Sequence, residues 1–170
     1  VSAGQNYSLN SSFQLKPSPT SFTPNTGSWN TYITVNGNSL YNSSLYFDEV
    51  FISNSNSYSN SISGSIPSSL LKKKFKIYIV SGGEKIEVPG GYFTMTGLTV
   101  NPLTQVKYFS GSLITFTGTG FNPNSNYNKI IIDGETIVSN SYTSMQFYLP
   151  TTISSGYFPI IVTNSLDSVK

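Results

Sequence analysis

The feature that most constrains this chain is a duplication, in which three short segments recur in the same order about 82 residues further along. ITVNG at 33 to 37 recurs as ITFTG at 114 to 118, SISGSIP ending at 67 as SMQFYLP ending at 150, and FKIYIVSGG from 75 as YFPIIVTNS from 157. Ile33 thus corresponds to Ile114, Pro67 to Pro150 and Phe75 to Tyr157. Because this spacing is nearly constant, we expect two units of one architecture, each with the length of a small β-sandwich.

The composition favours an all-β fold. Ser, Thr, Asn, Tyr, Phe and Ile are abundant, and the 14 Gly and 9 Pro residues fall mostly between the apolar segments rather than within them. We expect one β-sandwich unit at residues 17 to 92 and a second at residues 93 to 170, behind an N-terminal extension at residues 1 to 16.

The surface chemistry is typical of an extracellular protein. Charged residues make up 9 % of the chain, well below the roughly 25 % of an average soluble protein, so hydroxyl and amide side chains or attached sugar must keep it soluble. The chain begins at Val1, which suits removal of a signal peptide. All nine basic residues are Lys, which lacks the planar fork of Arg, so we expect no nucleic-acid partner. No apolar run approaches the ~20 residues of a transmembrane span.

Two β-hairpins are predicted from their turns. The segments KIII and ETIV flank Asp133-Gly134, a pair that adopts the positive φ angles of a type I′ turn at little cost. The segments IYIV and EKIEV flank Ser81-Gly82-Gly83, which predicts a hairpin with a three-residue loop.

The order of these turns and strands resembles the IPT/TIG group of immunoglobulin-like domains. The second unit carries the resemblance in SGSLITFTGTGF, IIIDGETIVSNSYTSMQFYLP and SGYFPIIVTNS, and the first in SPTSFTPNTGSWNTYITVNG, SISGSIPSSL and FKIYIVSGG. The likeness covers residues 17 to 168 and departs from the group at the Ser/Asn stretch of residues 53 to 61. Neither unit has the group's frequent Gly-Gly pair before its second strand. The resemblance implies two immunoglobulin-like β-sandwiches in tandem, with a binding or structural role.

Side chains that carry catalysis are scarce. The chain has no His and no Cys, so a hydroxyl nucleophile lacks its usual base, and disulfides and thiolate metal sites are excluded. Asp133 and Glu135 flank a hairpin turn, and Asp48-Glu49 are expected side by side on a strand, so neither pair is arranged for glycoside hydrolysis. We therefore expect no enzymatic activity, no metal and no cofactor.

The N-terminal extension alternates between apolar and polar residues. Within residues 1 to 15 the apolar side chains all occupy odd positions: Val1, Ala3, Tyr7, Leu9, Phe13 and Leu15. Because side chains on a strand point to opposite faces with a period of two, this segment presents one apolar and one polar edge. Two interpretations stay open: an extra edge strand on its own first unit, or a strand donated to a neighbouring copy. The anchors of a donated strand would be its four large apolar residues, Tyr7, Leu9, Phe13 and Leu15.

Three Asn-x-Ser/Thr sequons occur, at Asn6, Asn10 and Asn42. Asn6 and Asn10 fall on the polar edge of the extension, where sugar would leave the apolar anchors free. We expect glycosylation at these three positions in an organism that performs it.

Two further features have structural interpretations. Lys72, Lys73, Lys74 and Lys76 form a cluster that we interpret as a guard against edge-to-edge pairing rather than an anion site. Trp29, the one Trp of the chain, is expected to cap a hydrophobic core.

These features favour a secreted structural protein at the cell surface. Strand donation would join identical subunits head to tail, an arrangement that resembles donor-strand pilins, including bacterial chaperone–usher subunits and archaeal thread filaments. We therefore expect a filament subunit whose partner is a further copy of itself. One alternative is an adhesin or receptor module that binds a protein or glycan, for example on a host or neighbouring cell, through loops at one end of a sandwich. Another is a decoration or tail module of a virus particle.

Overall fold

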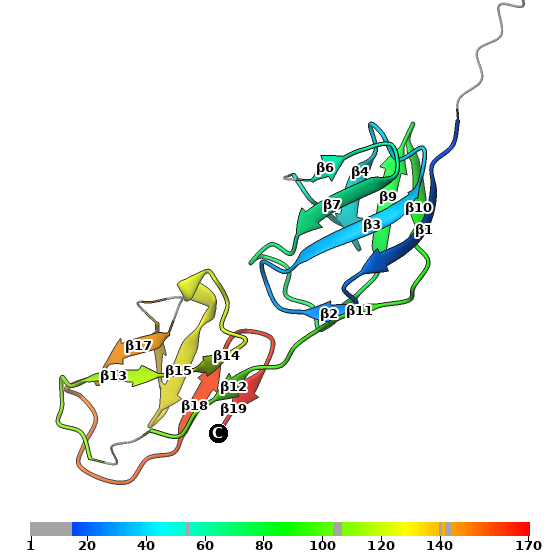
Figure 1. Cartoon of the computed structure of the whole chain (residues 1–170). Helices are drawn as coiled ribbons and strands as arrows, with labels where there is room; N and C mark the ends of the chain where they lie inside the picture. The colour runs from blue at the N-terminus through cyan, green and yellow to red at the C-terminus, as the bar shows by residue number, and fades with distance from the viewer. Residues whose placement is uncertain (1–14, 54, 104–106, 140, 142–143) are drawn as a thin grey trace, which may run out of the picture.

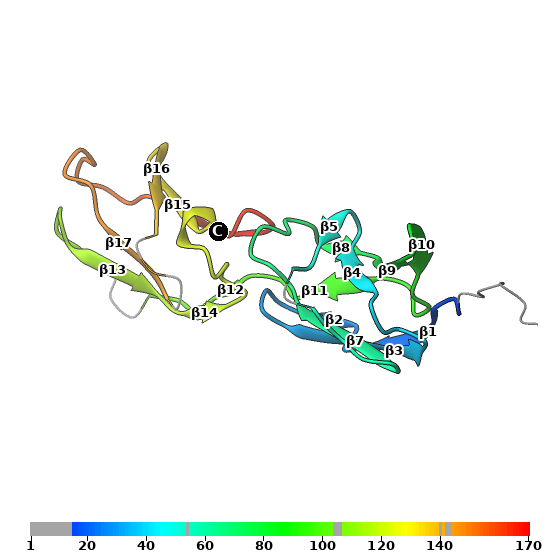
Figure 2. The same cartoon turned by 90° about the horizontal axis from the view of Figure 1, so that it is seen from above.

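The structure is a computed structural model that describes residues 15 to 53, 55 to 103, 107 to 139, 141 and 144 to 170. Its strands form two immunoglobulin-like β-sandwich units that lie end to end (Figure 1). Within the described residues the one helical segment is the 3-10 turn η1 (Ser125–Tyr127). In the first unit the sheet with β3 and β7 lies below the sheet with β4, β9 and β10 (Figure 2). The prediction of an all-β, immunoglobulin-like sandwich fold is confirmed.

The first unit contains three sheets. Its strands are β1 (Ser18–Thr23), β2 (Thr26–Gly27), β3 (Tyr32–Asn38), β4 (Ser44–Phe47), β5 (Val50–Phe51), β6 (Asn56–Ser57), β7 (Ser61–Ser65), β8 (Lys74–Phe75), β9 (Ile77–Ser81), β10 (Glu84–Glu87) and β11 (Phe93–Met95). Two four-stranded sheets, β1-β3-β7-β6 and β10-β9-β4-β5, make the sandwich. The short sheet β2-β11-β8 lies at the end near the second unit (Figure 1).

The second unit has fewer strands. They are β12 (Thr99–Val100), β13 (Leu113–Phe116), β14 (Gly118–Thr119), β15 (Lys129–Ile132), β16 (Glu135–Val138), β17 (Met145–Tyr148), β18 (Ile160–Thr163) and β19 (Ser168–Val169). They form the four-stranded sheet β16-β15-β18-β19 and the two-stranded sheets β13-β17 and β12-β14.

The two units repeat one order of strands. β3 pairs with β7 as β13 pairs with β17, and the order β10-β9-β4-β5 recurs as β19-β18-β15-β16. The flanking hydrogen bonds recur too, because the N–H of Ile66 donates to the Thr31 carbonyl and the N–H of Leu149 donates to the Ser112 carbonyl. Thr31 therefore corresponds to Ser112, and Ile66 corresponds to Leu149.

The register of the sheets shifts the correspondence between FKIYIVSGG and YFPIIVTNS, the third pair of repeated segments, by one residue. Phe47 pairs with Ile77 in the first unit, and Ile132 pairs with Ile160 in the second. Ile77 of β9 therefore corresponds to Ile160 of β18, and not to Pro159, its counterpart in the aligned letters. Because side chains alternate between faces, a slip of one position would turn the inward-facing side chains of the strand outward.

The hairpin around Asp133-Gly134 is confirmed, with φ angles of 50° and 78° and with β15 paired to β16. The other hairpin differs from its prediction. Ser81 pairs with Glu84, so the loop contains Gly82 and Gly83 alone, at φ angles of 58° and 83°. The predicted loop was one residue too long because Ser81 ends the strand β9.

The prediction that Asp48 and Glu49 lie on a strand is wrong. They form the turn between β4 and β5, with Phe47 paired to Val50 and Asp48 at a φ angle of 50°. The carboxylate of Asp48 accepts hydrogen bonds from the Lys76 backbone N–H at 2.8 Å and from the Lys72 ammonium at 2.6 Å. Partners distant in the chain therefore hold a turn that contains no glycine.

The first unit has a closed core. Among the described residues it comprises seventeen buried apolar side chains. Trp29 is one of them, 5 % exposed, and its indole N–H donates to the Leu70 carbonyl at 3.1 Å. This confirms that Trp29 belongs to a core. Phe75 lies between Phe47 and Phe93, with ring centroids 5.2 and 5.0 Å away.

The core of the second unit is smaller. Seven buried apolar side chains form it among the described residues, surrounded by side chains that are only partly buried. Phe116 and Phe147 stack at its centre, with ring centroids 6.0 Å apart. The second unit therefore has fewer buried apolar side chains among the described residues than the first, although both have the same order of strands.

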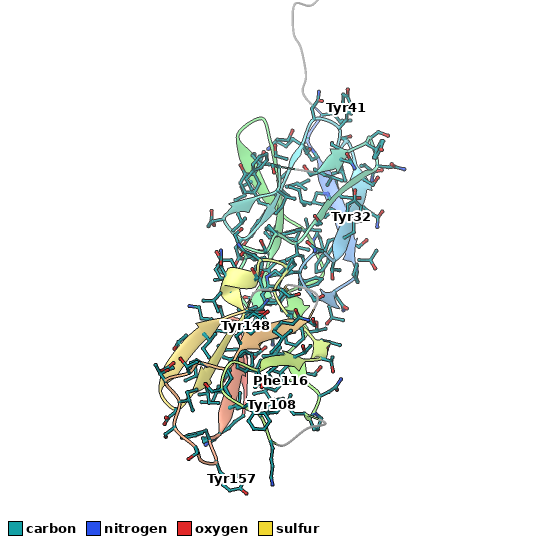
Figure 3. All side chains as sticks on the ribbon, turned by 90° about the vertical axis from the view of Figure 1, so that its left-hand side faces the viewer. Tyr32, Tyr41, Tyr108, Phe116, Tyr148 and Tyr157 are labelled. Atoms are coloured by element: carbon teal, nitrogen blue, oxygen red, sulfur yellow. The ribbon has the colours of Figure 1, made fainter. Side chains whose placement is uncertain are left out.

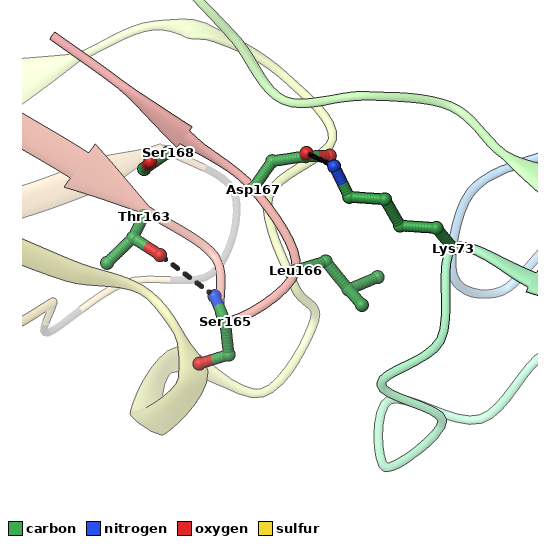
Figure 4. A pocket seen from close by; sticks show the side chains of 6 residues that line it. All are labelled: Lys73, Thr163, Ser165, Leu166, Asp167 and Ser168. Atoms are coloured by element: carbon green, nitrogen blue, oxygen red, sulfur yellow. Dashed lines mark hydrogen bonds and ion pairs between the residues drawn. The ribbon is translucent and has the colours of Figure 1, made fainter.

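The two units touch through a few side chains. Leu166 packs against the first core, and the ammonium of Lys73 pairs with the Asp167 carboxylate (Figure 4). The Asn122 side-chain amide donates to the Ser68 carbonyl at 2.9 Å. These contacts come from the loop between β18 and β19 and from the segment before η1.

The predicted unit limits, 17 to 92 and 93 to 170, stay a prediction. Phe93 and Met95 pack in the first core, and Leu98 packs in the second. Of the predicted extension at residues 1 to 16, the structure describes Leu15 and Lys16. The Lys16 ammonium lies 2.8 Å from the Glu84 carboxylate of the first unit.

Candidate functional site

Most of the site residues expected from sequence lie outside the described part of the chain. These are the anchors Tyr7, Leu9 and Phe13 and the sequons at Asn6 and Asn10. The fourth anchor, Leu15, is 68 % exposed. The third sequon residue, Asn42, is at the surface in a turn at a φ angle of 58°. Strand donation and glycosylation at these positions stay predictions.

The lysine cluster is largely neutralised by carboxylates. Lys72 pairs with Asp48, Lys73 with Asp167, and Lys76 with Glu87. Lys74 lies in β8, which pairs with β11. This cluster is thus not an open anion site. β8 is an edge strand of the sheet β2-β11-β8, and the guard interpretation stays a prediction.

The carboxylate of Asp48, which accepts hydrogen bonds from two residues of the lysine cluster, has a lowered pKa. Partial burial acts to raise the pKa of Asp48, but the hydrogen bonds from the Lys72 ammonium and the Lys76 backbone N–H outweigh it and keep the pKa below its ordinary value. The same hydrogen bond raises the pKa of Lys72. Both groups are therefore charged at neutral pH and stabilise the turn rather than exchange protons.

The acids do not assemble into a reactive centre in the part of the chain that the structure describes. There, no group of three or more His, Cys, Asp or Glu side chains is placed to hold a metal ion. Glu135 accepts a hydrogen bond from the Thr152 hydroxyl at 2.6 Å. Nor does any helix in this part have the length and apolar character to span a membrane.

The described residues of the second unit form an apolar groove with a volume of about 790 Å³. Tyr108 and Tyr157, which both line it, lie toward the end of the molecule away from the first unit (Figure 3). Its apolar lining consists of Leu103, Tyr108, Phe109, Ile114, Ile132, Leu149, Ile153, Tyr157, Phe158 and Ile160. We call this feature the distal groove.

The distal groove corresponds to the place that β11 takes in the first unit. There, β11 lies between β2 and β8, parallel to the first and antiparallel to the second. The positions equivalent to β2 are Lys107 and Tyr108, and those equivalent to β8 are Tyr157 and Phe158. All four line the groove. The described residues of the second unit contain no strand between these two segments.

The lining residues show the same correspondence. Phe158 is the equivalent of Phe75, and Leu149 is the equivalent of Ile66. Phe75 and Ile66 are fully buried in the first unit, whereas Phe158 and Leu149 are partly exposed. Side chains that form a core wall in the first unit thus form the wall of an open groove in the second.

The groove also has open backbone acceptors. In the first unit the N–H of Met95 donates to the Lys73 carbonyl at 2.8 Å, and the N–H of Thr96 donates to the Gly27 carbonyl at 2.6 Å. The equivalent acceptors are the carbonyls of Gly156 and Tyr108, which accept no hydrogen bond from the described residues. An extended segment placed here gains both apolar contacts and main-chain hydrogen bonds.

Sequence reasoning did not find the distal groove. A core residue and a groove wall have the same apolar character in a sequence, so no local pattern marks the groove. In the sequence the segment around Phe158 stands out only as the repeat of FKIYIVSGG, and its composition does not show which partner strand covers it.

No protein-family model matches the chain, and no curated protein matches it. Among solved structures it is similar to the plexin A4 extracellular region, at 15 % identity over 91 % of this chain and 17 % of that chain, with a TM-score of 0.41. It is also similar to the surface glycan-binding protein PbSGBP-B from Prevotella bryantii, at 14 % identity over 92 % of this chain and 41 % of that chain, with a TM-score of 0.40.

A third similar structure is a protein of unknown function from Bacteroides thetaiotaomicron, at 13 % identity over 93 % of this chain and 47 % of that chain, with a TM-score of 0.42. The chain spans less than half the length of each of these three proteins. Overlaps of this quality carry no conclusion about what the chain binds or how it assembles. The resemblances to the IPT/TIG group and to donor-strand pilins stay predictions.

Proposed function

We propose that this protein is an extracellular binding module whose second unit takes up an extended protein segment as an added strand. The observation that carries the proposal is the distal groove, which lies where the first unit holds its own strand β11. A binding role agrees with the alternative of an adhesin or receptor module better than with a catalyst, because the groove wall is mainly apolar.

The chemistry of the groove favours a protein segment over a glycan. Tyr157 and Phe109 are 99 % and 85 % exposed and offer ring faces for sugar stacking. A sugar would use the polar groups of the lining, but most of the lining surface is apolar. The polar groups are those of Lys107, Ser110, Ser154 and Ser155 and the hydroxyls of Tyr108 and Tyr157. The aliphatic floor matches alternate side chains of a strand, whose polar backbone meets the open carbonyls at the rim.

Whether the distal groove accepts a strand can be tested within a single chain, by extending that chain with a copy of β11. The register of β18 and β19 makes Lys170 the equivalent of Glu87. Appending the sequence of residues 88 to 97, VPGGYFTMTG, directly after Lys170 therefore places a copy of β11 in the distal groove. The matched control carries the same extension with Asp in place of its Phe and Met.

We expect the extension to raise the melting temperature of the second unit by about 10 °C, because two apolar side chains and main-chain hydrogen bonds are added. The control extension should leave it unchanged. Differential scanning calorimetry measures both. Equal melting temperatures for the extended, control and original chains would show that the distal groove does not accept a strand, and the proposed function would then be wrong.

A further inference from the structure

We propose that the occupant of the distal groove is the segment Tyr7-Ser8-Leu9 of a second copy of this chain. This inference rests on the proposed function, since it requires that the groove accept a strand. It assigns the acceptor to the second unit and one register to the donor, and it joins copies head to tail.

The extension matches the strand that it would replace. β11 has the order aromatic, polar, aliphatic, with Phe93 and Met95 buried and Thr94 partly exposed. The same order occurs twice in the extension, as Tyr7-Ser8-Leu9 and as Phe13-Gln14-Leu15. Because side chains alternate along a strand, either triplet places two apolar side chains toward the groove and one polar side chain outward.

The second triplet ends at Leu15, next to a contact with its own first unit. Leu15 directly precedes Lys16, whose ammonium pairs with Glu84 at 2.8 Å, and β1 begins at Ser18. The first triplet is separated from that point by the six residues 10 to 15, which can span up to ~20 Å when extended. Tyr7-Ser8-Leu9 is therefore the triplet that can reach a neighbouring molecule.

The positions of the two sites require a second copy. The described chain begins at the end of the first unit that lies away from the second unit (Figure 1). Tyr108 and Tyr157 of the groove lie at the opposite end of the molecule (Figure 3). A donor leaving one end and an acceptor at the other make a head-to-tail contact, which repeats without closing when the rotation between copies does not close a ring.

The first unit also gives the expected register. Phe93 stacks on Phe75 at 5.0 Å, so Tyr7 is expected on Phe158 of the acceptor. Thr94 pairs with Lys74, so Ser8 is expected opposite Tyr157. The donor then runs parallel to residues 107 and 108 of the acceptor and antiparallel to residues 157 and 158.

In this register the donor strand makes the same main-chain hydrogen bonds as β11. The N–H of Leu9 takes the role of the Met95 N–H and donates to the Gly156 carbonyl, and the N–H of Asn10 takes that of Thr96 and donates to the Tyr108 carbonyl. Thr96 is exposed in the first unit. A sugar on Asn10 would accordingly point to solvent in the joined copies.

The test uses the full chain carrying Leu9→Asp as acceptor, because its own extension no longer competes for the groove. The probe is a synthetic peptide of residues 1 to 15, and binding is measured by isothermal titration calorimetry. We expect one peptide per chain. Leu9→Asp in the peptide should weaken binding about a hundredfold, since it places a charge against an apolar wall. The matched control Ser8→Asp, one residue away on the polar edge, should bind within about threefold of the original peptide.

The outcomes separate this inference from the proposed function. If the chain extended by residues 88 to 97 is stabilised but the peptide of residues 1 to 15 does not bind, the groove accepts a strand from another source, such as chain beyond residue 170 or a foreign protein. The inference then falls and the proposed function stands. Equal weakening by Ser8→Asp and Leu9→Asp would also overturn the inference, because it would show binding without the assigned faces.

Discussion

The two units share one order of strands but differ in how their sandwiches end. The first unit completes itself with β11, whose Phe93 and Met95 close a core of seventeen buried apolar side chains among the described residues. The second unit has the equivalents of β1, β3, β4, β5, β7, β9 and β10, and its core numbers seven such side chains. The surface that β11 covers in the first unit is the distal groove of the second.

The strand pairing of the two units shows what the last strand adds to the first. The sheet order of the second unit forms without it, because each of its strands has a hydrogen-bonded partner. In the first unit this strand adds mainly apolar contact, through Phe93 and Met95. If the distal groove accepts a strand as proposed, that strand is exchangeable between copies, as in domain swapping, because its contacts do not depend on which molecule supplies it.

Substitution of two equivalent aromatic residues should give the largest difference in unfolding free energy between the units. Phe75 is fully buried between two rings, so Phe75→Ala should lower the free energy of unfolding of the first unit by about 3 to 5 kcal/mol. Its equivalent Phe158 is partly exposed at the groove, so Phe158→Ala should cost about 1 kcal/mol or less. Urea denaturation measures both, and equal losses would contradict the difference between a closed end in the first unit and an open end in the second.

The turn that contains Asp48 should lose stability in acid. Because the pKa of Asp48 is held below its ordinary value, its contribution to stability is present at neutral pH and is lost as the pH falls below about 3.8 and through the lowered pKa. Asp48→Asn should remove this contribution, so the unfolding free energy should fall less steeply as the pH is lowered. At neutral pH this substitution should cost less unfolding free energy than Phe75→Ala.

Asp133 is the matched control for Asp48, since it occupies the equivalent turn at the same φ angle and is exposed. Asp133→Asn should cost less unfolding free energy at neutral pH than Asp48→Asn, which removes the carboxylate contacts of Lys72 and Lys76. The check is the unfolding free energy measured as the pH is lowered from neutral through the range in which Asp48 titrates. If both substitutions cost the same unfolding free energy at neutral pH, the contacts from Lys72 and Lys76 would not be the cause of the loss at Asp48.

The smallest effect is expected where the units meet. The Lys73–Asp167 pair is largely exposed on the Lys side, so Lys73→Ala should cost at most about 1 kcal/mol. Its effect should appear as a weaker coupling between the unfolding transitions of the two units, measured by calorimetry. Lys74→Ala serves as the control, and a larger effect from it would place the contact between the units elsewhere.

Local signals in the sequence predicted much of the fold. The duplication indicated two alike units, and Asp133-Gly134 predicted its hairpin because that dipeptide favours the turn whatever surrounds it. The Asp48-Glu49 turn was missed because its positive φ angle is stabilised by Lys72 and Lys76, which lie far along the chain. Such contacts leave no mark on the local sequence pattern.

The distal groove could not be predicted for a different reason. Ile153, Phe158 and Ile160 have the composition of core residues, and a core residue and a groove wall look alike in a sequence. What separates them is the presence of a covering strand, which only the three-dimensional comparison with β11 reveals. The alternation of residues 1 to 15 was visible, but the acceptor and register of such a strand depend on the folded structure.

The most direct test of strand exchange is a disulfide between copies, since the chain has no Cys of its own. A chain with Ser8→Cys is mixed with a chain with Tyr157→Cys under mild oxidation, and linked peptides are identified by mass spectrometry. The account predicts a mixed disulfide joining positions 8 and 157 of different chains, with little from a Ser12→Cys control. Equal yields from positions 8 and 12, or no mixed disulfide, would contradict it.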